Sequence, residues 1–445
     1  MIIVIGAGPA GLAAAEAAAR NGSDVALIDS APRIGGQYWR HRTEVSGYRS
    51  NRAEALFAKI KASRSITYIS EASVWSIERD GTFIRVNYLQ GGTESSLTAE
   101  KLIIATGAYD RSLPFPGWDQ PGSMTPGAVQ ALYKGHGVLA GKRIVVAGTG
   151  PFLLPVATAL AEAGVEIVGL YEAHSPLRWA LSPVALIFNL SKFAELIYYW
   201  RLLAKHGIRP QFGQVVTSFA HGRATISHVD SDFQVKAKRA QTVEVDAVAV
   251  GWGFLPDLTL GGIAGCRQRV VSDGTTVFDV DRNQLSSQPN VWIAGEATGI
   301  GGADLSLLEG EIAGLAATGQ EISSRLRIKR YAKELFAQAL SRSYPIGDGW
   351  KSWSNEETVI CRCEEVTLAN IKESVVELGA EDSRTAKLFT RAGMGLCQGR
   401  VCSRNVAEIV AGLTGCSVSD EERIASSNRP IAAPISLGLL GDGKK

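Results

Sequence analysis

Four of the six cysteines lie near the end of the sequence in a pattern that can hold a metal centre. Cys361 and Cys363 form a C-x-C pair, and Cys397 and Cys402 form a C-x4-C pair after 33 intervening residues. Four thiolates with this spacing can enclose one tetrahedral metal ion or a [2Fe-2S] cluster. The segment around the second pair is polar and rich in glycine and arginine, which disfavours four unliganded core cysteines. The sequence therefore predicts a metal centre on these four thiolates.

The surroundings of these cysteines favour iron and sulfide over zinc. A C-x-C pair is tighter than the C-x2-C pair of most zinc knuckles. Positive side chains offset the charge of a thiolate-ligated cluster and raise its reduction potential. Four arginines flank the two pairs: Arg362, Arg391, Arg400 and Arg404. Zinc remains the alternative, because four cysteines satisfy it equally well.

A glycine-rich turn near the start of the sequence predicts a dinucleotide site. Gly6-Ala7-Gly8-Pro9-Ala10-Gly11 follows an apolar strand at 2–5 and leads into an alanine-rich helix at 12–20. The first glycine permits the tight turn, the second lets the backbone approach a diphosphate, and the third lets helix and strand pack closely. Asp29 ends the next strand, where a carboxylate accepts a hydrogen bond from a ribose hydroxyl. The predicted nucleotide contacts are Gly6, Gly8, Pro9, Ala10, Gly11, Asp29, Arg33, Gly36 and Gln37.

Two later turns favour FAD as this dinucleotide. Ala105-Thr106-Gly107 resembles the ATG turn of flavoproteins with two dinucleotide-binding domains, and Ile293-Ala294-Gly295-Glu296 resembles their second flavin motif. The acidic residue of that motif binds the ribitol of the flavin, and it is usually an aspartate, one methylene shorter than a glutamate. We therefore expect the cofactor to contact Thr106, Gly107, Gly295 and Glu296. Gln37, Tyr38 and Trp39 follow the Gly35-Gly36 turn. They either contact the flavin or only pack against the rest of the protein.

A second fingerprint, Gly148-Thr149-Gly150-Pro151-Phe152-Leu153, lacks the third glycine. In an intact reductase this segment would hold NAD(P)H against the flavin. A leucine at the third position separates helix from strand, and Pro151 and Pro155 crowd the turn. Glu172 closes the next strand, and no arginine cluster follows it to bind a 2′-phosphate, so NADP is less favoured than NAD. We expect the site to be vestigial, or to bind a nucleotide without hydride donation.

The sequence assigns no residue to catalysis. Disulfide reductases of this architecture carry a cysteine pair beside the flavin, and neither of the usual places has one here. Cys266 and Cys416 stand outside the pattern and are expected to be core residues, and the six histidines are scattered. The predicted chemistry is therefore electron transfer through cofactors.

These motifs require an α/β chain with two Rossmann-like domains, one inserted in the other, and a small helical domain at the end. Strand, glycine turn and helix follow one another in the same order in both nucleotide-binding segments. Because the second flavin motif comes after the inserted segment, the first domain is discontinuous. We predict an FAD-binding domain at 1–115 and 251–330, an NAD-binding-like domain at 116–250, a linker at 331–357, a [2Fe-2S] domain at 358–420 and an extended tail at 421–445.

Composition excludes several other classes of protein. The 445 residues are 45% hydrophobic and 20% charged, which suits two or three folded domains and disfavours disorder. A net charge of +2 from 46 basic and 44 acidic residues provides no field to attract nucleic acid or an anionic membrane. Met1 opens directly onto an apolar strand without a secretion signal. We therefore expect a cytoplasmic protein, with association to the inner membrane through its electron acceptor as the alternative.

The most apolar later stretch, 179–203, is not expected to span a membrane. Pro183, Asn189, Lys192 and Glu195 interrupt it, so no 18-residue uncharged run remains. Its apolar and aromatic side chains fit either an internal helix pair or the core of a protein interface. They are Trp179, Phe188, Phe193, Ile197, Tyr198, Tyr199 and Trp200.

The motifs together resemble one known family. Residues 359–367 and 390–402, which carry the cysteines, resemble the bacterioferritin-associated-ferredoxin (BFD) type of [2Fe-2S] domain. With IGAGPAGLAAA, PRIGGQYWR and GWGFLPD in the preceding segments, nearly the whole chain resembles the A (α) subunit of opine oxidases. It is also similar to the α subunits of hydrogen cyanide synthase and of the proline, hydroxyproline and sarcosine dehydrogenase or oxidase complexes.

The resemblance implies a partner and a reaction. In that family a separate β subunit resembling D-amino-acid oxidase carries the substrate flavin, and several members hold an FMN between the subunits. The chain would then relay electrons from a secondary amine, such as the opines octopine or nopaline, to a small-molecule acceptor or the respiratory chain. The imine product would hydrolyse to an amino acid and a keto acid. Two alternatives remain: a stand-alone NAD(P)H-dependent reductase with FAD and the same cluster, and a structural or regulatory subunit that only holds a nucleotide.

Overall fold

The computed structural model describes residues 1–42, 51–181, 189–236 and 240–442. The chain divides into two compact units. Unit 1 comprises Met1–Tyr109, Leu255–Ala337 and Ser427–Lys445, and unit 2 comprises Asp110–Phe254 and Gln338–Ser426. Three of the four borders fall within β8 (Ala108–Asp110), β17 (Phe254–Pro256) and α9 (Ser324–Ser343), and the fourth lies between Ser426 and Ser427. The domain boundaries expected at 115 and 251 lie a few residues from two of these borders and remain predictions.

Unit 1 is built on a five-stranded parallel sheet. In spatial order its strands are β20 (Val291–Ile293), β7 (Lys101–Ile104), β1 (Ile2–Ile5), β2 (Val25–Ile28) and β3 (Ile66–Ile69). Runs of Ile, Val and Leu suit such strands because both faces are covered. Along β1, Ile2 and Val4 belong to one core, and Ile3 and Ile5 belong to another on the opposite face.

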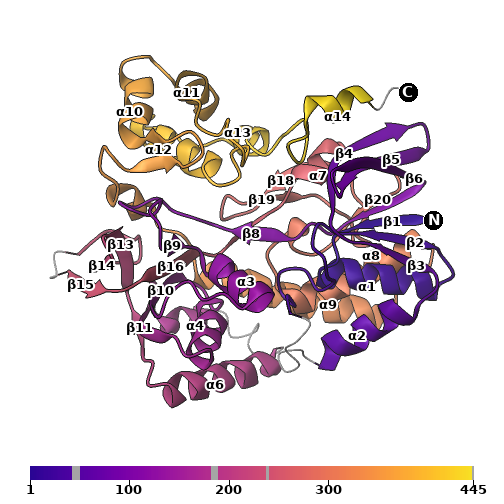
Figure 1. Cartoon of the computed structure of the whole chain (residues 1–445), viewed down its shortest axis with the longest axis horizontal. Coiled ribbons are helices and arrows are strands. Elements are labelled where there is room, and N and C mark those ends of the chain that lie inside the picture. Colours follow the sequence, from indigo (N-terminus) through magenta and orange to yellow (C-terminus); the bar gives the residue numbers. More distant parts are fainter. Residues whose placement is uncertain (43–50, 182–188, 237–239, 443–445) are drawn as a thin grey trace. The chain divides into compact units, whose positions relative to one another are not determined.

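Helices cover one face of this sheet, and a second sheet covers the other (Figure 1). The helices are α1 (Pro9–Arg20), α2 (Asn51–Ala62) and α8 (Ala303–Ala317). On the other face lie an antiparallel sheet of β4 (Ala72–Asp80), β5 (Phe83–Gln90) and β6 (Thr93–Ala99), and the shorter elements α7 (Thr259–Ile263), β18 (Gln268–Val270) and β19 (Thr276–Phe278). The carboxyl end of β1 thus leads straight into the glycine turn and α1.

Unit 2 repeats this plan. Its parallel sheet holds, in spatial order, β12 (Pro210–Phe212), β11 (Glu166–Glu172), β10 (Arg143–Thr149), β16 (Ala247–Trp252) and β9 (Ser123–Met124). Helices α3 (Pro126–His136), α4 (Leu153–Glu162) and α6 (Leu190–Lys205) share a core with one face. An antiparallel sheet of β13 (Gln214–Ala220), β14 (Arg223–His228) and β15 (Gln241–Glu244) shares a core with the other.

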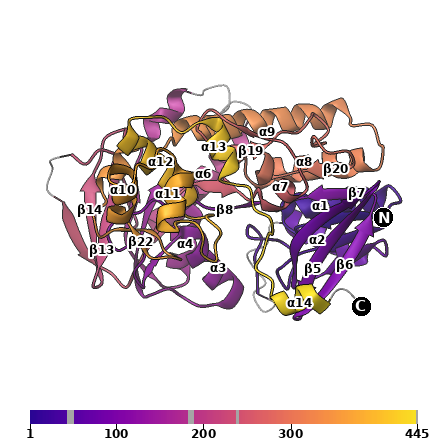
Figure 2. The ribbon, with the colours of Figure 1, turned by 90° about the horizontal axis from the view of Figure 1, so that it is seen from above.

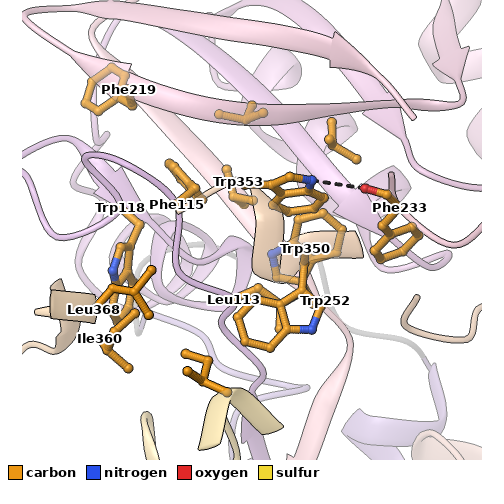
Figure 3. Close-up of a cluster of buried hydrophobic side chains, with 14 of the residues drawn as sticks. Leu113, Phe115, Trp118, Phe219, Phe233, Trp252, Trp350, Trp353, Ile360 and Leu368 are labelled. Atoms are coloured by element: carbon orange, nitrogen blue, oxygen red, sulfur yellow. Dashed lines mark hydrogen bonds between the residues drawn. The ribbon is translucent and has the colours of Figure 1, made fainter. Parts of the chain in front are cut away.

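The cysteine-bearing segment also belongs to unit 2 and forms a small helical group (Figure 2). Its elements are β21 (Val359–Cys361), β22 (Val366–Thr367), α10 (Leu368–Val376), α11 (Ser383–Thr390), α12 (Ser403–Thr414) and α13 (Asp420–Ala425). Figure 3 shows Ile360 and Leu368 of this group in one cluster with Leu113 and Phe115 of the preceding segment. The helical group therefore shares a core with the second Rossmann-like segment.

The segment 344–357 packs into that core and differs from the free linker expected from its composition. Trp350 is fully buried, and the Trp353 indole N–H donates to the Phe233 carbonyl at 3.0 Å (Figure 3). Its glycines serve close backbone contacts, since a Cβ on Gly349 would lie 2.4 Å from the amide nitrogen of Gln234. The rest of the expected linker, from 331 onward, lies in α9. Composition alone could not distinguish a tightly turned core segment from a linker.

The expected extended tail contains two short helices. It begins in α13 and ends in α14 (Leu437–Asp442). Between them, the Ser427 hydroxyl donates to Gln268 Oε1 at 2.6 Å and the Ala432 amide donates to the Trp75 carbonyl at 2.8 Å, all within unit 1. Across the part of the chain that the structure describes, every helix is too short or too polar to cross a membrane.

Candidate functional site

The first glycine fingerprint forms a turn. A Cβ added at each of its three glycines would meet different surroundings. A Cβ on Gly6, whose φ is +102°, would lie 2.3 Å from the Ala105 carbonyl oxygen. A Cβ on Gly11 would lie 1.7 Å from the Gly6 carbonyl oxygen. A Cβ on Gly8 would meet only the Gly36 Cα, at 4.0 Å. The first and third glycines are therefore required by the fold itself, whereas Gly8 leaves space that the protein does not fill, as a diphosphate site requires.

Pro9 and Ala10 place the helix directly behind this space. α1 begins at Pro9, where the missing N–H costs nothing, and Gly8 caps it in an extended conformation with φ of −77°. The Leu12 amide donates to the Gly8 carbonyl at 2.9 Å. The amides at the start of α1 thus have no intrahelical acceptor, and together with the helix dipole they form an anion-binding end.

Asp29 holds the glycine turn. Its Oδ2 accepts from the Ala7 amide at 2.5 Å, and its Oδ1 accepts from the Ala31 amide at 2.7 Å. Burial raises the pKa of Asp29, and these two hydrogen bonds oppose that rise. Each oxygen keeps a second lone pair, so the ribose contact predicted for Asp29 stays a prediction.

The Gly35-Gly36 turn packs against the fingerprint. The Gly35 amide donates to the Ala7 carbonyl at 2.8 Å, and a Cβ on Gly36 would lie 2.7 Å from the Gly8 Cα. Trp39 is buried in the core, so the packing alternative holds for it. Arg33, Gln37 and Tyr38 are exposed at this turn. The Arg33 guanidinium donates to the His41 carbonyl.

The two flavin-type turns are held by backbone hydrogen bonds within unit 1. The Thr106 hydroxyl donates to the Asp257 carbonyl at 2.8 Å, and the Asp257 amide donates to the Gly107 carbonyl at 3.0 Å. A Cβ on Gly295, whose φ is +80°, would lie 2.8 Å from the Ala10 Cβ, so this second turn abuts the start of α1. The glycine turn and the Gly295 turn are thereby brought together beside the open space over Gly8.

Glu296 lies on the second of these turns, in the 3-10 helix η2 (Glu296–Thr298). Its Oε1 accepts from the Gly302 amide at 3.1 Å, and burial raises the pKa of its carboxyl. Sequence reasoning missed the residue beneath it, Glu309, whose Oε2 accepts from the Gly295 amide at 3.0 Å. No sequence signal indicated Glu309, because Asp304 and Glu311 are acids of the same helix.

The second fingerprint is built differently. α4 begins at Leu153, three positions after Gly150, whereas α1 begins one position after Gly8. The amides of Leu153 and Leu154 donate to carbonyls of the turn, those of Gly150 and Pro151, at 3.3 and 3.2 Å. Amide groups that could face a diphosphate are therefore used within the turn.

Glu172 adds to this difference. It accepts from the Thr149 hydroxyl at 2.9 Å and from the amides of Gly150 and His174 at 2.8 and 3.0 Å. Burial raises its pKa to about 7. Leu153, in place of the third glycine, is buried in the core with the helices. A Cβ on Gly150, the counterpart of Gly8, would meet nothing within 4 Å, so open space lies over this turn too. The second turn thus differs from the first in its bonded amides and in Leu153.

The four pattern cysteines come together as two pairs. Cys361 and Cys402 are buried and hydrogen-bond each other, and Cys363 and Cys397, which are more accessible, form the second pair. The hydrogen bond with the Cys402 thiol lowers the pKa of Cys361 to about 5, and the same contact raises the pKa of Cys402. The Gly393 amide donates to Cys361 Sγ at 3.4 Å. Backbone donors of this kind favour a thiolate.

The pairing fits a cluster of two irons. The charges of Cys363 and Cys397 also act on Cys402, so the two pairs lie near each other. Two thiolates for each of two irons is the ligand set of a [2Fe-2S] cluster, which these two pairs can supply. Glycines let the loops close around the thiols, since a Cβ on Gly395 would lie 2.2 Å from the Cys363 Cβ.

The arginines predicted to flank the cluster are each fixed by a partner. The Arg362 guanidinium lies 5.3 Å from the centre of the Trp118 ring, and the Trp118 indole N–H donates to the Val359 carbonyl at 2.5 Å. No sequence pattern indicated this role of Trp118. Arg391 bonds Glu364, Arg400 bonds the Cys397 carbonyl, and Arg404 bonds Glu408.

Comparisons with known proteins agree with both halves of this description. Residues 1–310 match the family model described as pyridine nucleotide-disulphide oxidoreductase, and residues 359–412 match the BFD-like [2Fe-2S] binding domain. The chain is 30% identical to the A (α) subunit of opine oxidase from Agrobacterium tumefaciens (strain Ach5), over 99% of this chain and 91% of that protein. It is 31% identical to hydrogen cyanide synthase subunit HcnB of Pseudomonas protegens, over 90% and 89% of the two chains.

A solved structure shares the fold over nearly the whole chain. The L-proline dehydrogenase from P. horikoshii superimposes with a TM-score of 0.66 at 21% identity, covering 99% of this chain and 78% of that one. The two-Rossmann flavoprotein fold with a C-terminal [2Fe-2S] domain, expected from the sequence, is thereby confirmed. The chain is an oxidoreductase subunit that belongs to the pyridine nucleotide-disulphide oxidoreductase family and, within it, to the group formed by the A (α) subunits of opine oxidases and by hydrogen cyanide synthase subunit HcnB.

Proposed function

We propose that this chain is the electron-transfer subunit of a multi-subunit flavoprotein that oxidises a secondary amine. The observation that carries the proposal is the arrangement of four thiols as two pairs in unit 2. A [2Fe-2S] cluster exchanges single electrons, whereas a flavin can exchange one or two. A chain with both can accept an electron pair from substrate oxidation and release it one electron at a time.

The chain's own residues would bind and orient these groups. FAD and the cluster, when bound, supply the redox chemistry. In unit 1, Gly8 would leave room for the diphosphate, and the Glu296 carboxylate would bind the ribitol. In unit 2, four cysteines would hold the cluster, with Cys361 and Cys402 buried and Cys363 exposed.

A partner subunit would perform the substrate chemistry. We assign that role to a β subunit resembling D-amino-acid oxidase, with an FMN at the subunit interface. Loss of two electrons and two protons from the C–H and N–H bonds of the amine gives an imine, and water converts the imine to an amino acid and a keto acid. The electrons pass through this chain to a small-molecule acceptor or the respiratory chain. An opine such as octopine or nopaline is the proposed substrate, and the cytoplasm the proposed location.

NADH and NADPH are expected not to reduce the isolated chain at a useful rate. In the second turn the amides of Leu153 and Leu154 are bonded to carbonyls of the turn, and the Gly150 amide is bonded to Glu172. We expect flavin reduction below roughly 0.1 per second in stopped-flow mixing, against about 10 per second for a typical enzyme. Rapid bleaching of the flavin by NADH would instead select the stand-alone reductase, and a preparation with bound ATP or NAD but no FAD would select the structural subunit.

The chain is expected to be inactive alone and to form a stable complex with the partner flavoprotein. Coexpression should give one species in size exclusion and an amine-dependent dye reduction that neither subunit shows by itself. Octopine, nopaline, proline and sarcosine should be compared as substrates in the same assay. An isolated chain that oxidises an amine as fast as the complex would exclude the partner.

The face of α6 is a candidate for the partner interface and supplies a variant for that experiment. Ile197, Tyr198 and Trp200 are 52%, 54% and 43% exposed, while Leu203 anchors the helix in the core. Phe188 lies outside the described residues, and the side chain of Phe193 is likewise not described. Ile197→Asp should weaken the complex by at least about tenfold if this face is in the interface core. Phe83→Asp, an equally exposed position in unit 1, is the control.

A further inference from the structure

A buried carboxylate in α8 lies directly beneath the flavin-type turn of unit 1. Glu309 is only 3% exposed, although its helix is made mostly of small and apolar residues. The next residue, Gly310, brings α8 against α1, because a Cβ there would lie 2.0 Å from the Ala10 carbonyl oxygen. Glu309 is therefore carried by a helix whose position is fixed by backbone contact, and its carboxylate cannot follow a shift of the turn.

Both donors to one oxygen of this carboxylate come from the turn. Glu309 Oε2 accepts from the Gly295 amide at 3.0 Å and from the Thr298 hydroxyl at 3.1 Å. These donors stand at the two ends of the Gly295–Thr298 turn, and Glu296 lies between them. Hydrogen bonds from buried donors to a charged acceptor are about twice as strong as neutral ones. Together they fix the path of the backbone that carries Glu296.

The other oxygen pairs with a partly buried arginine. Arg330 Nε lies 3.5 Å from Glu309 Oε1, and the arginine comes from α9. Gln284, fully buried, accepts from Arg330 Nε at 3.3 Å and donates to the Ile293 carbonyl at 2.9 Å when its amide is oriented to satisfy both bonds. Ile293 is the last residue of β20, before the turn. The network thus reaches the turn from both sides.

The energetic cost of burying the Glu309 carboxylate indicates that this residue has a specific role. A buried carboxylate carries a large desolvation cost, which raises the pKa of Glu309 to about 7 against the opposing effect of Arg330. A leucine would fill a similar volume without that cost. The acid is explained first by the Gly295 amide, which would otherwise be buried without an acceptor. The Thr298 hydroxyl is shared between Glu309 and the Gly295 carbonyl, at 3.1 and 2.9 Å.

We propose that Glu309 is a positioning residue of the cofactor site, which holds the Gly295–Thr298 turn so that the Glu296 carboxylate faces the ribitol of FAD. The proposal rests on the assignment of FAD to unit 1. It adds a residue that does not itself touch the cofactor and that acts through the backbone of Glu296. Its effect should therefore appear in the affinity and the redox potential of the bound flavin.

The test compares four variants of the full-length chain. Glu309→Leu removes the acceptor, Thr298→Val removes one donor, and Glu309→Gln retains an acceptor oxygen of the same reach. Glu311→Gln is the matched control, because this acid lies on the same helix but is 38% exposed and pairs only with Arg20, at 3.6 Å. Each variant is stripped of flavin and titrated with FAD by fluorescence, and the flavin midpoint potential is measured on the reconstituted protein.

We expect Glu309→Leu to weaken FAD binding roughly 30- to 100-fold, because the turn loses its fixed acceptor. Thr298→Val should weaken it by roughly tenfold, Glu309→Gln should recover most of the wild-type affinity, and Glu311→Gln should match wild type. The flavin potential should shift in the leucine variant and not in the control. Hydrogen exchange in the apoprotein should be faster for residues 294–299 in Glu309→Leu and, to a smaller extent, in Thr298→Val, and unchanged in Glu311→Gln.

The outcomes separate this inference from the proposed function. If the wild-type protein and the leucine variant bind FAD equally well, the proposed role of Glu309 is wrong and the FAD assignment is intact. Wild-type protein that takes up no FAD overturns the assignment and this inference with it. If the leucine variant does not fold, Thr298→Val decides, and unchanged affinity and unchanged exchange at 294–299 in that variant overturn the proposal.

Discussion

Replacement of Cys363 by serine should remove the iron–sulfur centre and leave the fold in place. Cys363 is exposed, so the serine introduces no buried polar group, but it ligates iron poorly in place of a thiolate. The wild-type chain should contain about two irons and two acid-labile sulfides, and the variant close to none. Iron and sulfide analysis, with the visible absorption and the electron paramagnetic resonance of the reduced protein, measures the loss. Cys397→Ser, the other half of this pair, should behave in the same way.

The buried pair makes a useful contrast. Cys361 and Cys402 are each 1% exposed and belong to the core that unites the helical group with the second Rossmann-like segment. Serine there should cost the cluster and also about 1–3 kcal/mol of stability, because a hydroxyl replaces a buried sulfur. Cys416→Ser, at an exposed position outside the pattern, should change neither. One zinc and no sulfide in the wild-type chain would contradict the assignment.

The sequence was most informative where a short pattern determines geometry by itself. A strand, three glycines and a helix within 11 residues leave little freedom for the Gly6–Gly11 turn, and the structure places them as expected. The same is true of the C-x-C and C-x4-C pairs. The pairing across them depends on tertiary structure, because Cys361 and Cys402 meet only when the loops on either side of α10 and α11 close.

Residues that act through distant contacts could not be predicted in this way. Trp118 supports the cluster loop through a hydrogen bond to a residue 241 positions away. Glu309 looks like an ordinary helix acid until the turn 14 residues earlier folds onto it. Cys416, expected in the core, is exposed, since α12 ends at the left-handed Gly415 just before it. Cys266 is buried as expected.

The segment 344–357 illustrates the limit of composition. Its Pro, Gly, Asp and Ser residues are as common in linkers as in tight turns. What distinguishes the two cases is whether the accompanying apolar side chains are buried. Trp350 and Trp353 are, and the glycines around them allow the backbone to approach residues 232–234 closely. An isolated aromatic pair within a polar segment is thus better evidence of packing than the polar residues are of a linker.

Gly8→Val should produce a folded chain that lacks FAD. Gly8 has an extended backbone with φ of −77°, and its Cβ position meets only the Gly36 Cα, at 4.0 Å. An alanine at this position is in ordinary van der Waals contact, and a valine extends into the space that the diphosphate requires. We expect about one FAD per wild-type chain, less in Gly8→Ala and almost none in Gly8→Val. The flavin absorption of the purified proteins, relative to protein concentration, measures the series.

Gly11→Ala provides the matched contrast, because the two glycines differ in what surrounds them. A Cβ at Gly11 would lie 1.7 Å from the Gly6 carbonyl oxygen, so this variant should lose about 3 kcal/mol or more of stability as helix and strand are forced apart. Gly8→Val should retain the thermal melt of the wild-type apoprotein within a few degrees, since its Cβ would meet only the Gly36 Cα, at an ordinary 4.0 Å. Full FAD occupancy in a well-folded Gly8→Val chain would show that the diphosphate does not lie over Gly8. Equal destabilisation by both variants would show that Gly8, too, is required by the fold.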